Sequence, residues 1–159
     1  MRVGILAIGR LREPEESAIV LRYCRRLEQV GRARGLGFLE VRELPESRLP
    51  TPEQRKADEA ARLLAASGES IRVALDEHGR ALSSREFADF LGKCADGGQK
   101  SCIFLLGGPD GHGSPVLEGC NLRLSLSRLT LPHGLARVVL AEQLYRAATL
   151  LTNHPYHRP

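Results

Sequence analysis

The sequence lacks the marks of several protein classes. It contains no tryptophan, and aromatic residues make up only 4% of its 159 residues. Its four cysteines are widely scattered and form no Cys-x-x-Cys pair, which argues against a zinc ribbon or a thioredoxin-like motif. No secretory signal is recognisable, so reduced thiols are favoured over disulfides. We therefore expect a cytoplasmic protein.

Long hydrophobic runs are also missing. The apolar stretch Arg2–Ile8 is too short to cross a membrane, so no membrane association is expected. No internal repeat, low-complexity tract or shift in composition marks a domain boundary. The chain has 42% hydrophobic and 26% charged residues, which are ordinary values for a globular protein. We expect a single domain over residues 1–159.

Lysine is scarce among the basic residues. Only Lys56, Lys93 and Lys100 are lysines, and the other 20 of the 23 basic residues are arginines. A formal net charge of +4 permits a polyanionic partner such as RNA but does not require one. Arginine offers a planar fork for phosphate and base contacts. The same bias is also typical of GC-rich genomes, so composition alone leaves both explanations open.

Short apolar runs alternate with helical patterns along the whole chain. Strands are expected at Arg2–Ile8, Phe38–Leu44, Ile71–Leu75, Ser101–Leu106 and Asn121–Leu126. The helical patterns begin near Pro14, after a capping box of Thr51 with Gln54, at Ser83 or Ser84, around Pro115–Glu118, and after His133. This alternation predicts the α/β fold class, with a mainly parallel sheet flanked by helices on both faces.

Ligands of such sheets bind beyond the carboxyl ends of the strands. Three loops occupy such ends, namely Asp76–Gly79, which we interpret as a turn, Gly107–Gly113 and Ser127–His133. We expect them to converge if the last three strands are neighbours. The glycine loop is neither a P-loop nor a Rossmann fingerprint, because it lacks the Gly-Lys-Ser/Thr and G-x-G-x-x-G patterns. It is either a backbone against which a ligand lies or a tight turn.

The loop before the last helix has a similar ambiguity. An adenine could rest against Leu129 and Leu131, or the segment could be a plain connector. In the last helix, Glu142 and Arg146 have the spacing of an ion pair, which is either solvated or orients a neighbouring site.

The C-terminal tail is rich in groups that bind or titrate. His154 and His157 are only two potential metal ligands, and no Cys or acidic residue accompanies them, so we expect no metal. We expect the tail to fold over a ligand or a partner subunit. We also expect removal of Tyr156–Pro159 to cost little stability, because the tail is short and polar.

Several motifs follow one another in a fixed order in the C-terminal half of the chain. They are Val73-Ala-Leu-Asp76 with Gly79, Ser83-Ser84-x-Glu86-Phe87-Ala88, Phe104-Leu-Leu-Gly-Gly-Pro-Asp-Gly111, Leu126-Ser-x-x-Thr-Leu-Pro-His133, Arg137-x-x-x-x-Glu142-Gln-Leu-Tyr-Arg146 and Thr152-Asn-His-Pro-Tyr-His-Arg158. Together they resemble the small bacterial SPOUT methyltransferases that methylate N3 of a pseudouridine in large-subunit ribosomal RNA. His112-Gly113 and Arg128 depart from the family pattern.

The resemblance implies a C-terminal trefoil knot and S-adenosylmethionine as cofactor. It implies a homodimer in which two chains complete each site, acting on helix 69 of the 23S rRNA in the ribosome. The implied cofactor-binding residues are Leu75, Gly107, Leu126, Ser127, Arg128, Leu129, Thr130 and Leu131.

For catalysis the candidates are His133, Tyr156, His157 and Arg158. His157 or an ordered water is the expected acceptor of the N3 proton. RNA contacts are expected from Arg137, Arg146 and His154. The alternative is a non-catalytic RNA-binding or ribosome-associated factor on the same fold, against which the retained cofactor loops argue.

Overall fold

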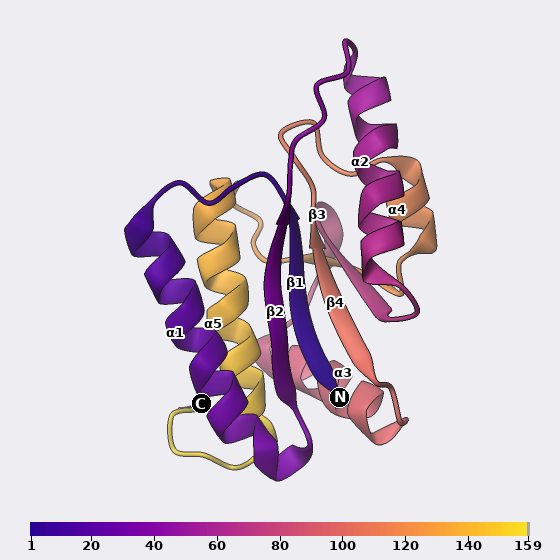
Figure 1. Cartoon of the computed structure of the whole chain (residues 1–159). Coiled ribbons are helices and arrows are strands. Elements are labelled where there is room, and N and C mark those ends of the chain that lie inside the picture. The colour runs from indigo at the N-terminus through magenta and orange to yellow at the C-terminus, as the bar shows by residue number, and fades with distance from the viewer. Residues whose placement is uncertain (159) are drawn as a thin grey trace.

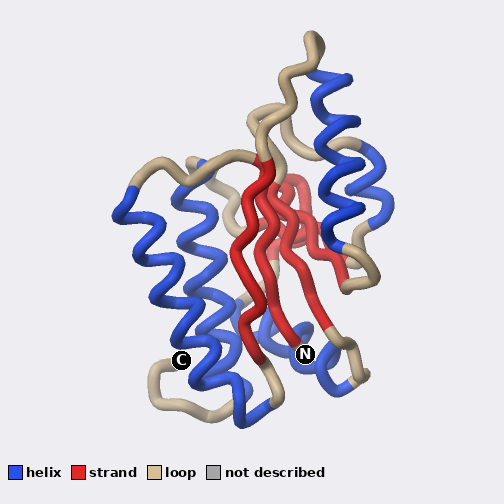
Figure 2. The backbone as a smooth tube through the Cα atoms, viewed as in Figure 1, coloured by secondary structure: helices blue, strands red, loops and turns tan. Residues whose placement is uncertain are grey.

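A sheet of parallel strands lies at the centre of the computed structural model, which describes residues 1–158 (Figures 1 and 2). The strands are β1 (Arg2–Ile8), β2 (Gly37–Leu44), β3 (Ile71–Ala81), β4 (Ser101–Leu106) and β5 (Leu122–Ser125). Their order in the sheet is β2-β1-β4-β3-β5, and every neighbouring pair is parallel. β1 and β4 are buried over almost their whole length, as expected of strands with both faces covered.

Helices cover both faces of the sheet, as the alternating pattern predicts (Figure 1). One face is covered by α1 (Pro14–Gly31), α3 (Ser84–Asp96) and α5 (His133–Leu151), and the other by α2 (Pro52–Ser67) and α4 (Ser114–Gly119). A short 3-10 helix, η1 (Arg32–Arg34), follows α1. Both α2 and α3 begin at capping boxes, and the first is the expected pair of Thr51 and Gln54.

The core is divided by the sheet into two apolar layers. Leu27 of α1, Phe87 of α3 and Leu140 of α5 pack on one side, whereas Leu63 of α2 and Val116 of α4 pack on the other. Burial at this scale supplies the main stabilising free energy of such a domain. No helix within residues 1–158 is both long enough and apolar enough to span a membrane.

Strand β3 differs from its expected extent. It does not end in a turn after Leu75 but continues to Ala81, and both Leu75 and Arg80 pair with Leu124 of β5. The segment from Asp76 to Gly79 is therefore a bulge in the ladder. A side chain on Gly79 would lie 2.7 Å from the backbone of Arg123, so the missing side chain allows β5 to approach here.

Candidate functional site

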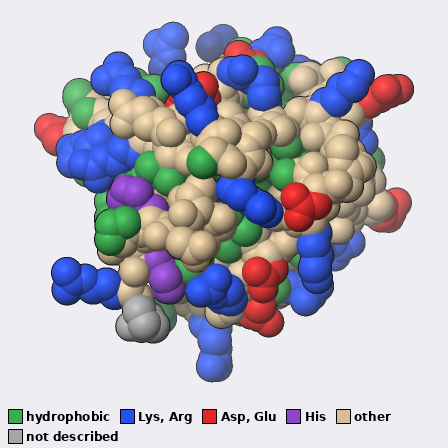
Figure 3. Space-filling view, turned by 90° about the horizontal axis from the view of Figure 1, so that it is seen from below, with side chains coloured by type: hydrophobic (Ala, Val, Ile, Leu, Met, Phe, Trp, Pro, Cys, Tyr) green, Lys and Arg blue, Asp and Glu red, His purple; other side chains and the backbone are tan. Residues whose placement is uncertain are grey.

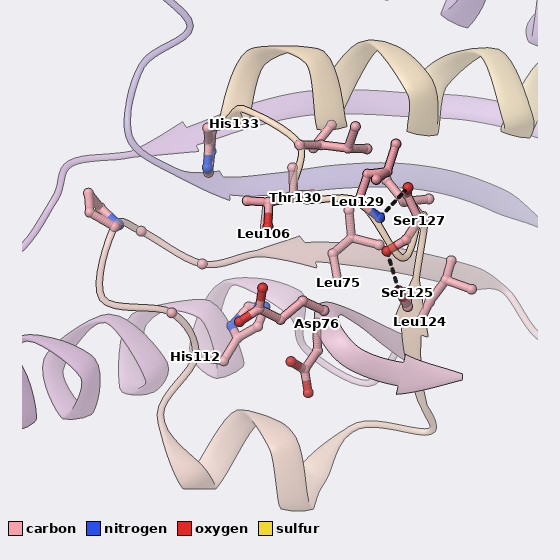
Figure 4. Close-up of a pocket in the computed structure, with 18 residues that line it drawn as sticks. Leu75, Asp76, Leu106, His112, Leu124, Ser125, Ser127, Leu129, Thr130 and His133 are labelled. Atoms are coloured by element: carbon pink, nitrogen blue, oxygen red, sulfur yellow. Dashed lines mark hydrogen bonds between the residues drawn. The ribbon is translucent and has the colours of Figure 1, made fainter. Parts of the chain in front are cut away.

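A cavity of about 390 Å³ lies beyond the carboxyl ends of β3, β4 and β5 (Figure 4). Its walls come from three segments: the end of β3 with its bulge, the glycine loop after β4, and the loop between β5 and α5. These strands are neighbours in the sheet, and their loops converge as the sequence predicts. The volume falls in the range of sites that hold a small molecule or cofactor, roughly 300–1,000 Å³.

The glycine loop at this cavity is a tight turn. Gly111 adopts φ +83° and donates its N–H to the carbonyl of Gly108 at 2.9 Å. A side chain on Gly107 would lie 3.0 Å from the backbone of Gly111, not in open space. The turn interpretation therefore explains the glycines, although Gly107 itself also lines the cavity.

Helix α2 holds this loop from outside the cavity. Arg55 donates from Nε and Nη2 to the two carboxylate oxygens of Asp110, at 2.7 and 3.2 Å. The hydrogen bond from Arg55 holds the pKa of Asp110 below its usual value. This two-point contact fixes the loop from a neighbouring helix.

The loop between β5 and α5 forms the opposite wall and is fixed by its own serines. Ser125 Oγ donates to the carbonyl of Ser127 at 3.0 Å, and Leu129 N–H donates to Ser127 Oγ at 2.9 Å (Figure 4). Of the expected cofactor residues, Leu75, Gly107, Leu126, Ser127, Leu129, Thr130 and Leu131 line the cavity. Arg128 is not among them and is exposed.

A polar wall made by Asp76 and His112 was missed by the sequence analysis. His112 Nε2 lies 3.1 Å from the carbonyl oxygen of Leu105, and its buried Nδ1 has no hydrogen-bond partner within residues 1–158. Burial lowers the pKa of His112, although the Leu105 carbonyl and Asp76 act in the opposite direction. The imidazole is therefore neutral at pH 7. Two signals pointed here: both residues lie in loops expected to converge, and residue 112 departs from the family pattern.

His133 lies at the rim of the same cavity, at the first residue of α5. Desolvation by its neighbours and the positive charge of Arg137 lower its pKa, whereas Glu46 and Glu43 raise it. The net shift keeps the ring neutral at pH 7, so it has a lone pair that can accept a proton.

Arg137 does not have the position expected of an RNA contact. Its side chain is 1% exposed, and its Nη1 donates to Glu43 Oε2 at 2.7 Å while its Nη2 donates to the carbonyl of Gly9 at 3.3 Å. A buried guanidinium that is bound on two sides has no free face for phosphate. We therefore replace the expected RNA contact by a structural role, in which α5 is bound to the ends of β1 and β2.

The tail folds back along α5, away from the cavity. None of Arg146, His154, Tyr156 and His157 lines the cavity. The ring of Tyr156 packs at a tilt against Tyr145 with centroids 4.6 Å apart, and its hydroxyl donates to Glu142 Oε1 at 3.1 Å. Figure 3 views the molecule from below, and Lys and Arg side chains are scattered across that face.

The Glu142–Arg146 pair belongs to this tail contact. Both side chains are half-buried, and Arg146 also lies over the Tyr156 ring, 5.1 Å from its centroid. The pair is therefore not simply solvated, but it lies against the tail and not beside the cavity, so the structure does not show it orienting that site. Among the described residues, no group of three or more His, Cys, Asp or Glu side chains is placed to hold a metal ion.

Comparison with known proteins gives matches over the full chain. The family described as "Predicted SPOUT methyltransferase" matches residues 1–157. A protein of Brucella anthropi named "Ribosomal RNA large subunit methyltransferase H" is 47% identical over 160 residues, which cover 99% of both chains. A protein of Methylocella silvestris with the same name is 45% identical over 159 residues, again with 99% of both chains covered.

Solved structures give weaker likenesses. The SpoU methyltransferase AviRb of Streptomyces viridochromogenes, solved in complex with AdoMet, has a TM-score of 0.43 at 18% identity; the match covers 90% of this chain and 56% of that one. A probable methylase family protein from Haemophilus influenzae has a TM-score of 0.47 at 18% identity, with 99% of this chain and 70% of that chain covered.

Proposed function

We propose that this chain, a member of the SPOUT methyltransferase family, methylates N3 of a pseudouridine in helix 69 of the 23S rRNA. The family and its relatives make it an S-adenosylmethionine-dependent methyltransferase of ribosomal RNA. The observation that carries the activity is the cavity where the three strand-end segments meet. The finer choice of nucleotide rests on the resemblance described above, above all on the Asn-His-Pro-Tyr-His-Arg tail.

The cavity fits the proposed cofactor in size and in the character of its walls. Leu75, Leu106, Leu126, Leu129 and Leu131 offer an apolar surface for an adenine, with backbone groups between them. Leu129 is 78% exposed, an unusual state for a leucine next to a cavity, and a bound ligand would cover part of it. When bound, S-adenosylmethionine supplies the methyl group.

The residues of the chain have to position the base and remove one proton. N3 of pseudouridine attacks the methyl carbon as the bond from carbon to sulfur breaks, and the N3 proton must pass to a base. We propose His157 or an ordered water as this acceptor, with neutral His133 at the rim as a further candidate. Tyr156 and Arg158 would orient the base, and Arg146 and His154 would contact the RNA. A target base has to leave its stack to reach such a site.

The position of the tail leads us to propose a homodimer with shared sites. To reach the cavity of its own chain, the tail would have to leave Tyr145 and Glu142. A second copy could instead place its tail at the cavity with these contacts intact. Leu21 on α1 and Leu135 on α5 are 44% and 46% exposed, and both would be available for such an interface.

Two further properties complete the proposal. We propose that the segment from β4 to α5 forms the trefoil knot implied by the family, because α5 follows the edge strand β5 yet packs on α1, which lies on the same face toward the opposite edge at β2. We also propose a cytoplasmic protein, since its substrate would be the ribosome.

The direct test uses ribosomes from a strain that lacks this protein. The purified protein and S-adenosylmethionine should add one methyl group to a pseudouridine of helix 69, detected by mass spectrometry of rRNA fragments. Methylation elsewhere in the 23S rRNA would contradict the substrate, and no methylation of any rRNA would contradict the activity.

A mixing experiment tests the shared site. One chain lacks Tyr156–Pro159 and the other carries Leu126→Arg in the cavity, so each alone should be inactive. Random pairing gives one intact site in four, so co-expression should restore about a quarter of wild-type activity. Recovery of no activity, with mixed dimers present, would show that each chain uses its own tail.

A further inference from the structure

The cavity has two chemically different sides. One side is built of leucines, whereas Asp76 and His112 make a polar wall across from Leu129, Thr130 and His133 (Figure 4). Glu77 also lines the cavity. We propose that Asp76 binds the positively charged sulfonium of the cofactor and so makes the site prefer S-adenosylmethionine to its uncharged-sulfur product, S-adenosylhomocysteine. This inference rests on the proposed function, because it presupposes that cofactor.

The charge of Asp76 has no strong partner in the chain. Its side chain is only 16% exposed, and no Lys or Arg forms an ion pair with it among residues 1–158. Among residues 1–158, the basic side chain within ion-pair distance of it is His78, whose Nδ1 lies 3.7 Å away on a ring that is 83% exposed. A half-buried carboxylate without a fixed cation creates a negative potential in the cavity, and that potential favours a cationic ligand.

The geometry of Asp76 leaves one oxygen free. The backbone N–H of His78 donates to Oδ1 at 3.2 Å, which holds the carboxylate in place within the β3 bulge. Oδ2 takes part in no hydrogen bond within the described residues, so it remains available to a ligand. His112 does not compensate this charge, because its ring is held at the Leu105 carbonyl and burial lowers its pKa.

The position of Asp76 next to the apolar side indicates that its partner is the sulfonium of the cofactor. Asp76 directly follows Leu75, which lies on the apolar side that suits the adenosine part. The sulfur is attached to the ribose, so it is the first charged group beyond the adenosine. The α-ammonium lies further along a flexible chain. The side chain of Glu77 is 68% exposed, so Glu77 is better placed than Asp76 to contact the α-ammonium near solvent.

The test compares ligands that differ at the sulfur. Asp76→Asn keeps the size of the side chain and removes its charge, and Glu77→Gln is the matched control on the next residue. Calorimetry should show S-adenosylmethionine binding about tenfold weaker to Asp76→Asn, as expected for the loss of one charged contact, with S-adenosylhomocysteine changed less than about twofold. The affinity of Asp76→Asn for sinefungin, which carries an amine in place of the sulfonium, should fall together with its affinity for S-adenosylmethionine. Glu77→Gln should leave the ratio unchanged.

Other outcomes separate this inference from the function on which it rests. Equal weakening of both ligands by Asp76→Asn would overturn it, because the carboxylate would then contact a shared group such as the ammonium. Unchanged affinity would overturn it as well. Asp76→Glu, which restores the charge, should recover part of the preference in a protein of unchanged melting temperature. If the wild-type chain bound no S-adenosylmethionine, the proposed function would fail and this inference with it.

Discussion

At the scale of single residues, Arg137 shows how a charge can serve the fold. It is the largest side chain among those that are almost fully buried, and its partner Glu43 lies on the second strand. Breaking a buried pair leaves a charge without compensation, which is more destabilising than the pair is stabilising. Glu43 is about one-third exposed, so water screens part of the loss.

We expect Arg137→Met to lower the free energy of unfolding by about 3 kcal/mol, at the lower end of the values for buried pairs. For a domain of this size the melting temperature should fall by roughly 6–12 °C. Arg22→Met on the exposed side of α1 is the control and should change little. An equal melting temperature for both variants would show that the buried guanidinium contributes nothing specific.

The same pair predicts a dependence on pH. Burial raises the pKa of Glu43, but the hydrogen bonds from Arg137 and Leu11 outweigh it, so the net pKa is lowered. A lowered folded-state pKa means that the stabilisation is complete above the unfolded value, about 4.3. It is lost as the pH falls through the folded value. In urea titrations, the difference in free energy of unfolding between wild type and Arg137→Met should therefore become smaller below about pH 4. If this difference stayed constant down to pH 3, the stabilisation would not come from the charge of Glu43.

At the scale of elements, the bulge in β3 depends on Gly79. A methyl group there would lie within 2.8 Å of backbone atoms of Arg123 and Leu124, so β5 would have to move. We expect Gly79→Ala to cost about 1–3 kcal/mol, as overpacking does. It should also weaken cofactor binding, because Leu124 lines the cavity.

Gly119→Ala is the matched control for that substitution. Its added methyl group would lie 3.8 Å from Leu64, an ordinary contact. Stability and cofactor affinity should be unchanged or slightly improved in thermal melts and calorimetry. If Gly79→Ala had the same stability and cofactor affinity as this control, β5 could move aside without a loss of free energy.

The strands and their mainly parallel pairing could be predicted, because apolar runs alternate with helical patterns, whereas their order in the sheet could not. The convergence of three loops followed from the same pattern. The bulge could not be predicted, since it depends on how closely β5 approaches Gly79. Nor could the burial of Arg137, because Glu43 is 94 residues away in the sequence and only the fold brings the two together. The sequence places Asp76 in a loop at the expected ligand site, but its side-chain role could not be predicted, because that depends on which groups the fold brings near it.

At the scale of the whole molecule, the tail contributes to stability as well as to the proposed chemistry. Removal of Tyr156–Pro159 deletes the ring contact with Tyr145 and the hydrogen bond to Glu142. We therefore expect a larger loss than the tail's polar composition suggests, about 2 kcal/mol or roughly 4–8 °C. Tyr156→Phe keeps the ring and should lose less than half of this. If the truncated protein had the same melting temperature as the wild type, these contacts would contribute little to stability.

The assembly should be visible in solution. The mass of one chain is 17.5 kDa, and light scattering at micromolar concentration should give about twice this value for a homodimer. Leu21→Glu and Leu135→Glu place charges on the exposed apolar positions of α1 and α5 and should shift the mass toward the monomer. A wild-type chain that stays at the mass of one copy would contradict the shared site.

The separation of cavity and tail has a kinetic consequence. Cofactor uptake per chain does not depend on how many chains are present, because the cavity is formed within one copy. Turnover under the shared-site proposal does depend on it, since an isolated copy holds the methyl donor without the groups that prepare the base. Below the dissociation constant of the pair, the reaction becomes second order in protein, and halving the number of chains reduces the output about fourfold. Expression level would then control rRNA modification more steeply than in proportion.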